Sequence, residues 1–310
     1  MQLVTYEDFI AKVMEKITSH YEGNGILVEV KLSKVQKVNG ISLDGISIMT
    51  KDKNTNICPT IYLNGYFSDY ERGRTLESIV DAIIEVNEEH QVSESFDIKD
   101  FLDFNIVKEN VLCKVINTEW NKELLEDVPH VELLDMSIIF VVGLEKIPDG
   151  YITIRNEHLK MWDISLDELK EVAMQNIKKE QYHITDMLSV LMGFGKDLDV
   201  DGCLLEDFEA ANADSMMYVL TNEKKMYGAT ILARPEFLEK MATIVGGDIF
   251  ILPSSVHELI ALPAWDTSDE RIQELRNMIE EVNSTQVSRE ERLSNNLYLY
   301  KRATKELTIA

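Results

Sequence analysis

The sequence predicts an α+β protein in two subdomains, with mixed or antiparallel sheets covered by helices. Helical apolar patterns alternate with short strand-like runs, and 45% of the 310 residues are hydrophobic, enough to build a core. A polar segment, EEHQVSESFDIKD, interrupts this pattern. We therefore expect an N-terminal α+β subdomain over residues 1–92, a linker with a short helix over 93–110, and a C-terminal α+β domain with helix–hairpin units over 111–310.

The N-terminal subdomain is predicted to contain a helix, three strands and a second helix. Thr5 caps the first helix, whose apolar residues fall on one face, and Gly23 and Gly25 end it. The strands are expected at GILVEVKL, LDGISIMT and ICPTIYL, with KDKNTN as the turn before the last. Thr75 caps the second helix. Such a unit needs a helix to cover one face of its sheet.

The first half of the C-terminal domain mixes short helices with strands. FLDFNIV predicts a short helix, VLCKVI a strand, and INTEWNKELLEDVPH a helix that ends near Val128–Pro129. The nearly all-apolar MSIIFVVGL predicts a central strand buried on both faces, with YITI as its hairpin partner. Ser165 and Glu168 have capping-box spacing before the helix SLDELKEVAMQNIKK. A further helix is expected over Tyr182–Met192.

The last third has a clearer order of elements. MMYVLT and ATILA predict two strands, and Pro235 lies in the first turn of a helix that Gly246 and Gly247 stop. DIFILP predicts a third strand. Thr267 with Glu270 caps a further helix, and NLYLY closes the chain as a strand.

The formal net charge of −24 is spread along the chain and limits the possible partners. Such a surface repels phosphate backbones, so we expect no direct nucleic-acid binding. It either keeps the protein dispersed or attracts a basic partner protein. No apolar run is long enough to span a bilayer, and Cys58, Cys113 and Cys203 are few and far apart. We expect a cytoplasmic protein with reduced thiols and no membrane contact.

Several segments, in this order, resemble a known family: PTIYLNGYF, INTEWNKELLEDVPHVELLDMSIIF, MYVLTN, GATIL and GGDIFILPSSVHELIALP. The family comprises uncharacterised bacterial proteins, mainly from anaerobic Gram-positive bacteria, and is catalogued as a domain of unknown function. The part after about Val111 is more distantly similar to a second uncharacterised bacterial family with a hairpin, helix, hairpin, helix, strand order. Neither resemblance implies an activity or a catalytic residue.

A polar turn after DIFILP carries catalytic residue types: Ser254, Ser255, His257 and Glu258. A serine hydrolase needs a hydroxyl, an imidazole and a carboxylate that converge in space, usually from separate segments. Here they lie within five residues, and no G-x-S-x-G motif is present. Ser255 and Glu258 instead have capping-box spacing. We expect the serines to cap a helical turn, with catalysis as the alternative.

An acidic segment resembles the start of a calcium loop. Asp197, Asp199, Asp201 and Gly202 match its first six positions, but Phe208 stands where a bidentate Glu is expected. An acidic linker is the favoured interpretation, and weak calcium binding at Asp197–Asp207 is the alternative.

Polar residues at two predicted strand ends are candidates for a binding pocket. They are Asn117, Glu119, Trp120 and Asn121 after the first strand of the C-terminal domain, and Tyr218 and Asn222 in MYVLTN. No phosphate-binding glycine motif occurs, so no cofactor is expected. The favoured function is non-enzymatic binding of a partner protein, with a serine hydrolase or a calcium-binding module as alternatives.

Overall fold

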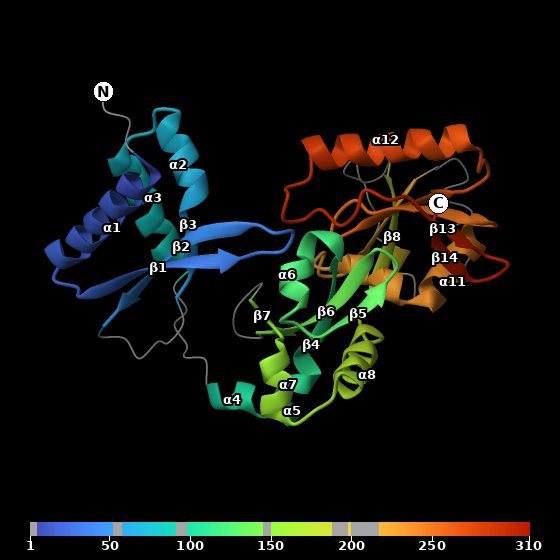
Figure 1. Cartoon of the computed structure of the whole chain (residues 1–310), viewed down its shortest axis with the longest axis horizontal. Coiled ribbons are helices and arrows are strands. Elements are labelled where there is room, and N and C mark those ends of the chain that lie inside the picture. Colours follow the sequence, from blue (N-terminus) through green and yellow to red (C-terminus); the bar gives the residue numbers. More distant parts are fainter. Residues whose placement is uncertain (1–4, 52–57, 91–97, 145–149, 188–197, 200–216) are drawn as a thin grey trace. The chain divides into compact units, whose positions relative to one another are not determined.

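Helices and antiparallel sheets make up the chain in its computed structural model, which confirms the predicted α+β class (Figure 1). The structure describes residues 5–51, 58–90, 98–144, 150–187, 198–199 and 217–310. The chain divides into two compact units. Unit 1 comprises Met1–Lys37 and Ile41–Lys99, and unit 2 comprises Val38–Gly40 and Asp100–Ala310.

Unit 1 packs helices against a three-stranded sheet of order β1-β2-β3. Its elements are α1 (Tyr6–Gly23), β1 (Val28–Gln36), β2 (Ser42–Thr50), β3 (Thr60–Tyr62), α2 (Leu63–Glu71) and α3 (Leu76–Glu89). Both predicted caps are confirmed, because the hydroxyls of Thr5 and Thr75 accept the amides of Asp8 and Ser78. Fully buried core side chains come from all three helices and the sheet: Phe9, Val13, Ile17, Ile46, Leu63, Ile79 and Ile83.

Helix α2 corrects the predicted order of helix, three strands and helix, because it adds a helix directly after β3. Its Phe67 ring packs on Tyr6 and Phe9 of α1, at centroid distances of 4.9 and 5.2 Å. These tertiary contacts hold a helix in a segment whose Asn64 and Gly65 are poor helix formers.

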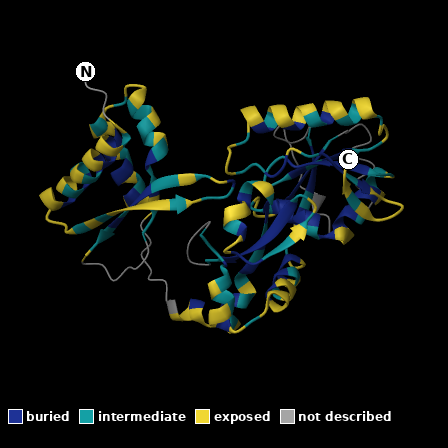
Figure 2. Ribbon diagram, viewed as in Figure 1, coloured by how far each residue is buried: buried dark blue, intermediate teal, exposed yellow. Residues whose placement is uncertain are grey.

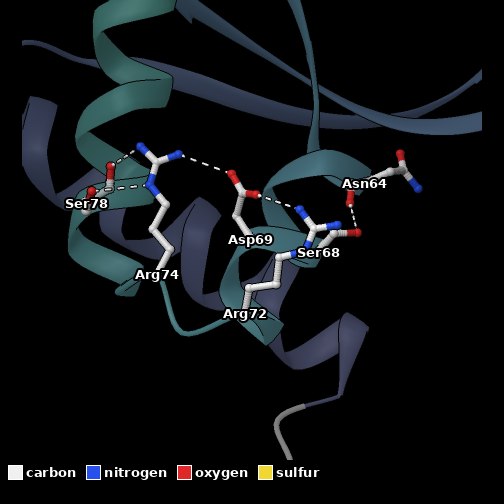
Figure 3. A network of polar contacts seen from close by, with 6 residues as sticks. All are labelled: Asn64, Ser68, Asp69, Arg72, Arg74 and Ser78. Carbon is white, nitrogen blue, oxygen red and sulfur yellow. Dashed lines mark hydrogen bonds and ion pairs between the residues drawn. The ribbon is translucent and has the colours of Figure 1, made fainter. Parts of the chain in front are cut away.

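A polar network joins the end of α2 to the start of α3 (Figure 3). Asp69 lies between the guanidinium groups of Arg72 and Arg74, at 3.8 and 3.4 Å. Arg74 also donates to the hydroxyl and the carbonyl of Ser78. These side chains are largely exposed, so the network contributes little stability and we assign it no functional role.

The first sheet of unit 2 is built around β6, which is buried on both faces as predicted. The strand order is β4-β6-β5, and β7 pairs with the other half of β6. The elements are α4 (Ile98–Leu102), α5 (Phe104–Val107), η1 (Lys108–Asn110), β4 (Val111–Asn117), η2 (Glu119–Asn121), α6 (Lys122–Leu125), β5 (His130–Leu133), β6 (Met136–Gly143), β7 (Tyr151–Thr153), α7 (Asn156–Trp162) and α8 (Leu166–Ile177).

The predicted helix over INTEWNKELLEDVPH is wrong. Its first residues end β4, only the short η2 and α6 are helical, and His130 starts β5. The proline before His130 and the side-chain amides of Asn117 and Asn121, which bond to nearby backbone groups, limit the helical stretch. The predicted capping box of Ser165 and Glu168 is confirmed.

The second sheet of unit 2 has seven strands in the order β14-β13-β11-β12-β10-β8-β9. Helix α12 covers one face through Leu275 and Ile279, while α11 lies on the other side (Figures 1 and 2). The elements are β8 (Tyr182–Asp186), β9 (Leu198–Asp199), β10 (Tyr218–Asn222), η3 (Gly228–Ala233), α11 (Pro235–Val245), β11 (Ile249–Leu252), β12 (Leu259–Pro263), α12 (Asp269–Thr285), β13 (Tyr298–Lys301) and β14 (Glu306–Ile309).

Four predictions in this region need correction. Tyr182–Asp186 is a strand rather than part of a helix, because its aromatic and branched residues pair along β10. ATILA lies in the 3₁₀ helix η3, and β14 follows the strand expected to close the chain. The cap of α12 is Ser268, one residue after the predicted Thr267. Pro235 and Gly246 do start and end α11, and Gly246 takes a φ of 80°.

Candidate functional site

The turn from Ser254 to Glu258 joins β11 to β12 and is held by its own side chains. The Ser255 hydroxyl accepts the amides of His257 and Glu258, at 3.0 and 3.3 Å. The amide of Ser255 donates to the carbonyl of Glu258 at 3.0 Å. Ser254 donates to the Glu258 carboxylate at 3.4 Å. Because β12 begins at Leu259, the serines close a turn between two strands and not the expected helical turn.

The His257 imidazole is held by the loop before η3. Its Nδ1 accepts the amide of Tyr227 at 3.2 Å, so the ring hydrogen belongs on Nε2, which lies 3.8 Å from a carboxylate oxygen of Glu291. The unprotonated nitrogen, which a general base would use, is therefore occupied by a backbone amide. In the described part of the chain, the hydrogen bonds of Ser254 and Ser255 go to Glu258 and to backbone groups, not to this ring.

The loop that carries Tyr227 has an unusual backbone. Lys225 and Tyr227 have φ values of 51° and 56°, which side-chain-bearing residues adopt only at a cost in energy. Gly228 follows, and a Cβ there would lie 2.4 Å from the carbonyl oxygen of His257. That carbonyl also accepts the Thr221 hydroxyl at 2.8 Å. The loop at Tyr227 and the turn from Ser254 to Glu258, which we call the serine turn, are thus packed tightly against each other. The sequence analysis did not predict this contact.

Tyr227 is the centre of a half-buried cluster of rings and charge. The His257 imidazole stacks on it at 5.6 Å with an interplanar angle of 12°, and the Tyr151 ring meets it edge-on at 5.1 Å. The Lys114 ammonium lies 4.7 Å from the ring centroid. Burial lowers the pKa of His257, the Lys114 charge lowers it further, and the Glu291 carboxylate opposes both.

We expect His257 to make unit 2 less stable as the pH is lowered through the normal range of histidine. The pKa of His257 is lower in the folded state than in the unfolded state. Below about pH 6.5 the unfolded chain therefore binds a proton at His257 more readily than the folded chain does, and this favours unfolding. His257→Gln should flatten this dependence partly, because burial also lowers the pKa of His158. Urea unfolding from pH 7.5 to 5.5, with exposed His20→Gln as control, measures it. An unchanged slope in His257→Gln would contradict the assignment.

The Asn117 cluster stabilises backbone at the end of β4. Asn117 accepts the amide of Trp120 at 3.0 Å, and Asn121 donates to the Asn117 carbonyl at 2.7 Å. Asn121 also exchanges two hydrogen bonds with Asn39, a buried residue with a φ of 61°. Glu119 is exposed and pairs with a lysine, and Trp120 is half-buried. The two buried asparagines of this candidate set therefore have structural partners.

Tyr218 and Asn222 are both buried in β10. The pKa of Tyr218 is raised by burial and by the charge of Asp186. The Asn222 side chain exchanges two hydrogen bonds with the backbone of Met226, and its amide lies 3.5 Å from the Glu180 carboxylate. None of these residues, nor Asn117 or His257, lines the apolar pocket at α12 that is described below.

Glu180 ends a chain of three oxygen contacts. Its carboxylate lies 2.9 Å from the Tyr182 hydroxyl, which lies 2.9 Å from the Thr230 hydroxyl, which in turn lies 2.9 Å from the Tyr227 carbonyl. Two hydroxyl hydrogens cannot fill three hydrogen bonds. Burial raises the pKa of Glu180 and so favours the protonated carboxyl, the form that can donate the third hydrogen bond.

We expect Glu180→Gln to stabilise unit 2 by about 1 kcal/mol at pH 7.5, because the amide can donate where the ionised carboxylate cannot. Because the pKa of Glu180 is raised in the folded state, the protonated side chain stabilises the folded protein below the unfolded-state pKa. This contribution is lost as the pH rises through the folded-state pKa. The stability advantage of Glu180→Gln should therefore vanish near pH 4. Urea unfolding followed by tryptophan fluorescence measures unit 2 alone, since Trp120, Trp162 and Trp265 all lie there. Exposed Glu223→Gln is the control, and equal stability of the two variants would refute the idea.

An apolar pocket opens between α12 and the ends of β11 and β12. Its cavity volume is about 50 Å³, it is partly open to solvent, and its walls expose almost only carbon atoms. Its lining residues are Met217, Leu252, Pro253, Ser254, Ile260, Met278, Ile279, Val282 and Asn283. Met278 stands at the rim with 40% of its surface exposed. Of the predicted site residues only Ser254 reaches it. The other lining residues lie on α12 or in and next to β10, β11 and β12, and only Ile279 and Val282 of α12 belong to its predicted apolar face.

The acidic segment proposed for calcium lies largely outside the described residues. Asp197 and Asp201 are not described, and the backbone of Asp199 belongs to β9, which pairs with β8. Among the described residues no group of three or more His, Cys, Asp or Glu side chains is arranged to hold a metal ion. Over the same residues no helix has the length and hydrophobicity needed to cross a bilayer.

Comparison with known proteins gives one result. Residues 6–302 match the model of DUF5688, described as a family of unknown function. No curated protein and no solved structure matches the chain.

Proposed function

This chain belongs to DUF5688, a family of unknown function, and we propose that it binds a partner protein by taking one apolar side chain of that partner into the pocket under α12. The pocket is the observation that carries this proposal. Pockets for whole small ligands range from about 300 to 1,000 Å³, so a partly open pocket of about 50 Å³ is too small for such a ligand and suits a single anchoring side chain.

The polar groups at the pocket are already bonded to the protein itself. Asn283 donates to the carbonyl of Ser294 and to the side chain of Asn295, at 2.9 and 2.8 Å. Ser254 donates to Glu258. A ligand would therefore find mainly apolar contacts, and leucine, methionine or phenylalanine is the kind of side chain that gains from them.

Charge around the pocket favours a basic partner. The outward face of α12 is exposed (Figure 2). It is also acidic, because it carries the exposed Glu270, Glu274, Glu280 and Glu281, and the whole chain carries −24. The helix also holds Arg271, which pairs with Glu274 at 3.1 Å. Lysine or arginine beside the apolar anchor would add attraction and faster association. We further propose a cytoplasmic location, supported by the free thiols of Cys58 and Cys113.

The test uses two basic peptides that differ only in one central residue, leucine or serine. We expect the leucine peptide to bind about tenfold more tightly, because the leucine is partly buried. Met278→Glu should remove this preference, and exposed Asn277→Glu, which adds the same charge outside the pocket, should keep it. Fluorescence anisotropy measures affinity, and the methyl NMR signals of Met217 and Met278 should shift. Equal binding of both peptides would refute the pocket.

The serine hydrolase remains the alternative because Ser254 lines this pocket. It requires the His257 ring to accept a hydroxyl proton, yet its Nδ1 accepts the Tyr227 amide. We therefore expect no labelling by a serine-directed fluorophosphonate. Labelling that disappears in a folded His257→Ala variant would establish the hydrolase instead.

A further inference from the structure

Strand β1 has an open edge. It is nine residues long and stands first in the sheet order, and among the described residues only β2 pairs with it. Unpaired amides and carbonyls along such an edge are ready to pair with another strand. Apolar side chains lie beside them, with Leu27 56% and Leu32 45% exposed. This edge belongs to unit 1 and is independent of the pocket in unit 2.

We propose that β1 pairs with β1 of a second copy of this chain, antiparallel and about a two-fold axis at Val30. An isologous contact must be self-complementary, and this register is. Val28 then faces Leu32 of the other copy, and Glu29 faces its Lys31. Apolar pairs and opposite charges that face each other across strands stabilise antiparallel sheets.

The faces of the strand agree with this register. Val28 and Val30 pack against the core of unit 1, and Leu32 lies on the same face by alternation. Pairing would extend that apolar face across the two-fold axis and cover Leu32. Glu29 and Lys31 lie on the opposite face, where their side chains already approach to 3.3 Å within one chain. Two three-stranded sheets would thus become one of six strands.

A register shifted by two residues lacks this match. A two-fold axis at Leu32 would set Val30 opposite Lys34 and Lys31 opposite Ser33, with no ion pair. A lysine on an edge strand usually discourages pairing. In the Val30 register the partner's Glu29 neutralises Lys31, so a second copy supplies the opposite charge at this position.

The test measures the mass of the full chain by light scattering and sedimentation over a range of concentrations. We expect a concentration-dependent dimer. Lys31→Glu sets two pairs of glutamates against each other and should weaken dimerisation at least about tenfold. The charge swap Glu29→Lys with Lys31→Glu should restore it. Lys34→Glu makes the same charge change, but its side chain faces Ile26 in this register, so the dimer should persist.

Each other outcome overturns the proposal. A wild-type monomer at every concentration excludes pairing, whatever the peptide experiments on unit 2 give. Equal weakening by Lys31→Glu and Lys34→Glu would reflect net charge and not the register, and a failed charge swap would exclude the Glu29–Lys31 contact. Circular dichroism of each variant keeps loss of folding separate from loss of pairing.

Discussion

Gly228→Ala should destabilise unit 2 by about 3 kcal/mol or more, the largest effect we expect from adding one methyl group. The new Cβ would lie 2.4 Å from the His257 carbonyl oxygen and 2.9 Å from the Asn222 amide nitrogen. Both are backbone atoms, one at the end of β10 and one in the turn just before β12, so they cannot move aside cheaply. The loop at Tyr227 would have to separate from the serine turn.

Gly247→Ala is the matched control, because nothing lies within 4 Å of a Cβ at that position. It should change the free energy of unfolding by less than about 0.5 kcal/mol. Urea unfolding followed by tryptophan fluorescence compares the two. If Gly228→Ala were as stable as Gly247→Ala, the two segments would not be packed as described.

Asp135→Ala should cost about 4 kcal/mol. The Asp135 carboxylate accepts three hydrogen bonds from the segment after α12: from the hydroxyls of Ser294 and Tyr298, each at 2.7 Å, and from the amide of Asn296 at 2.9 Å. Each bond to a charged group contributes about 1.5–3 kcal/mol, and alanine leaves three donors without a partner.

Asp135→Asn keeps the shape of the side chain and should lower the free energy of unfolding by about half as much. The amide oxygen can still accept hydrogen bonds, but the NH₂ group is a donor and would face a donor of the protein. Asp127→Ala is the control, because that carboxylate is half exposed and pairs with Arg155, an interaction of at most about 1 kcal/mol. The same urea experiment ranks the three variants. A loss of under about 1 kcal/mol in Asp135→Ala would mean that water replaces the carboxylate.

Local chemistry in the sequence was enough to predict many elements. The hydroxyl caps at Thr5, Thr75 and Ser165 and the stop at Gly246 are fixed by neighbouring residues, and the structure confirms them. The apolar run of β6 is long enough to be recognised as a central strand. Helical spacing on α12 predicted burial, but it could not reveal that the partner surface leaves a pocket.

Interactions between distant segments explain the failures. Tyr182–Asp186 has an apolar content that suits either a helix or a strand, and pairing with β10 decides it. Gly228 packs on the His257 carbonyl, and Asp135 accepts hydrogen bonds from the segment after α12. Both contacts join residues far apart in the chain, so the local spacing of residue types cannot predict them. The serine turn contains the residue types of a catalytic site. However, the Ser255 hydroxyl and the His257 ring already accept hydrogen bonds from neighbouring backbone amides.

The assignment of Val38–Gly40 to unit 2 affects how the protein can be dissected. Asn39 donates through its side-chain amide to the carbonyls of Arg289 and Arg292, at 2.9 and 2.8 Å, from a position before most of unit 1 in the sequence. Unit 2 is therefore discontinuous along the chain. A fragment that begins at Asp100 would lack Asn39, the residue that holds its C-terminal segment. Truncation at the apparent domain boundary would therefore remove two hydrogen bonds of unit 2 together with unit 1.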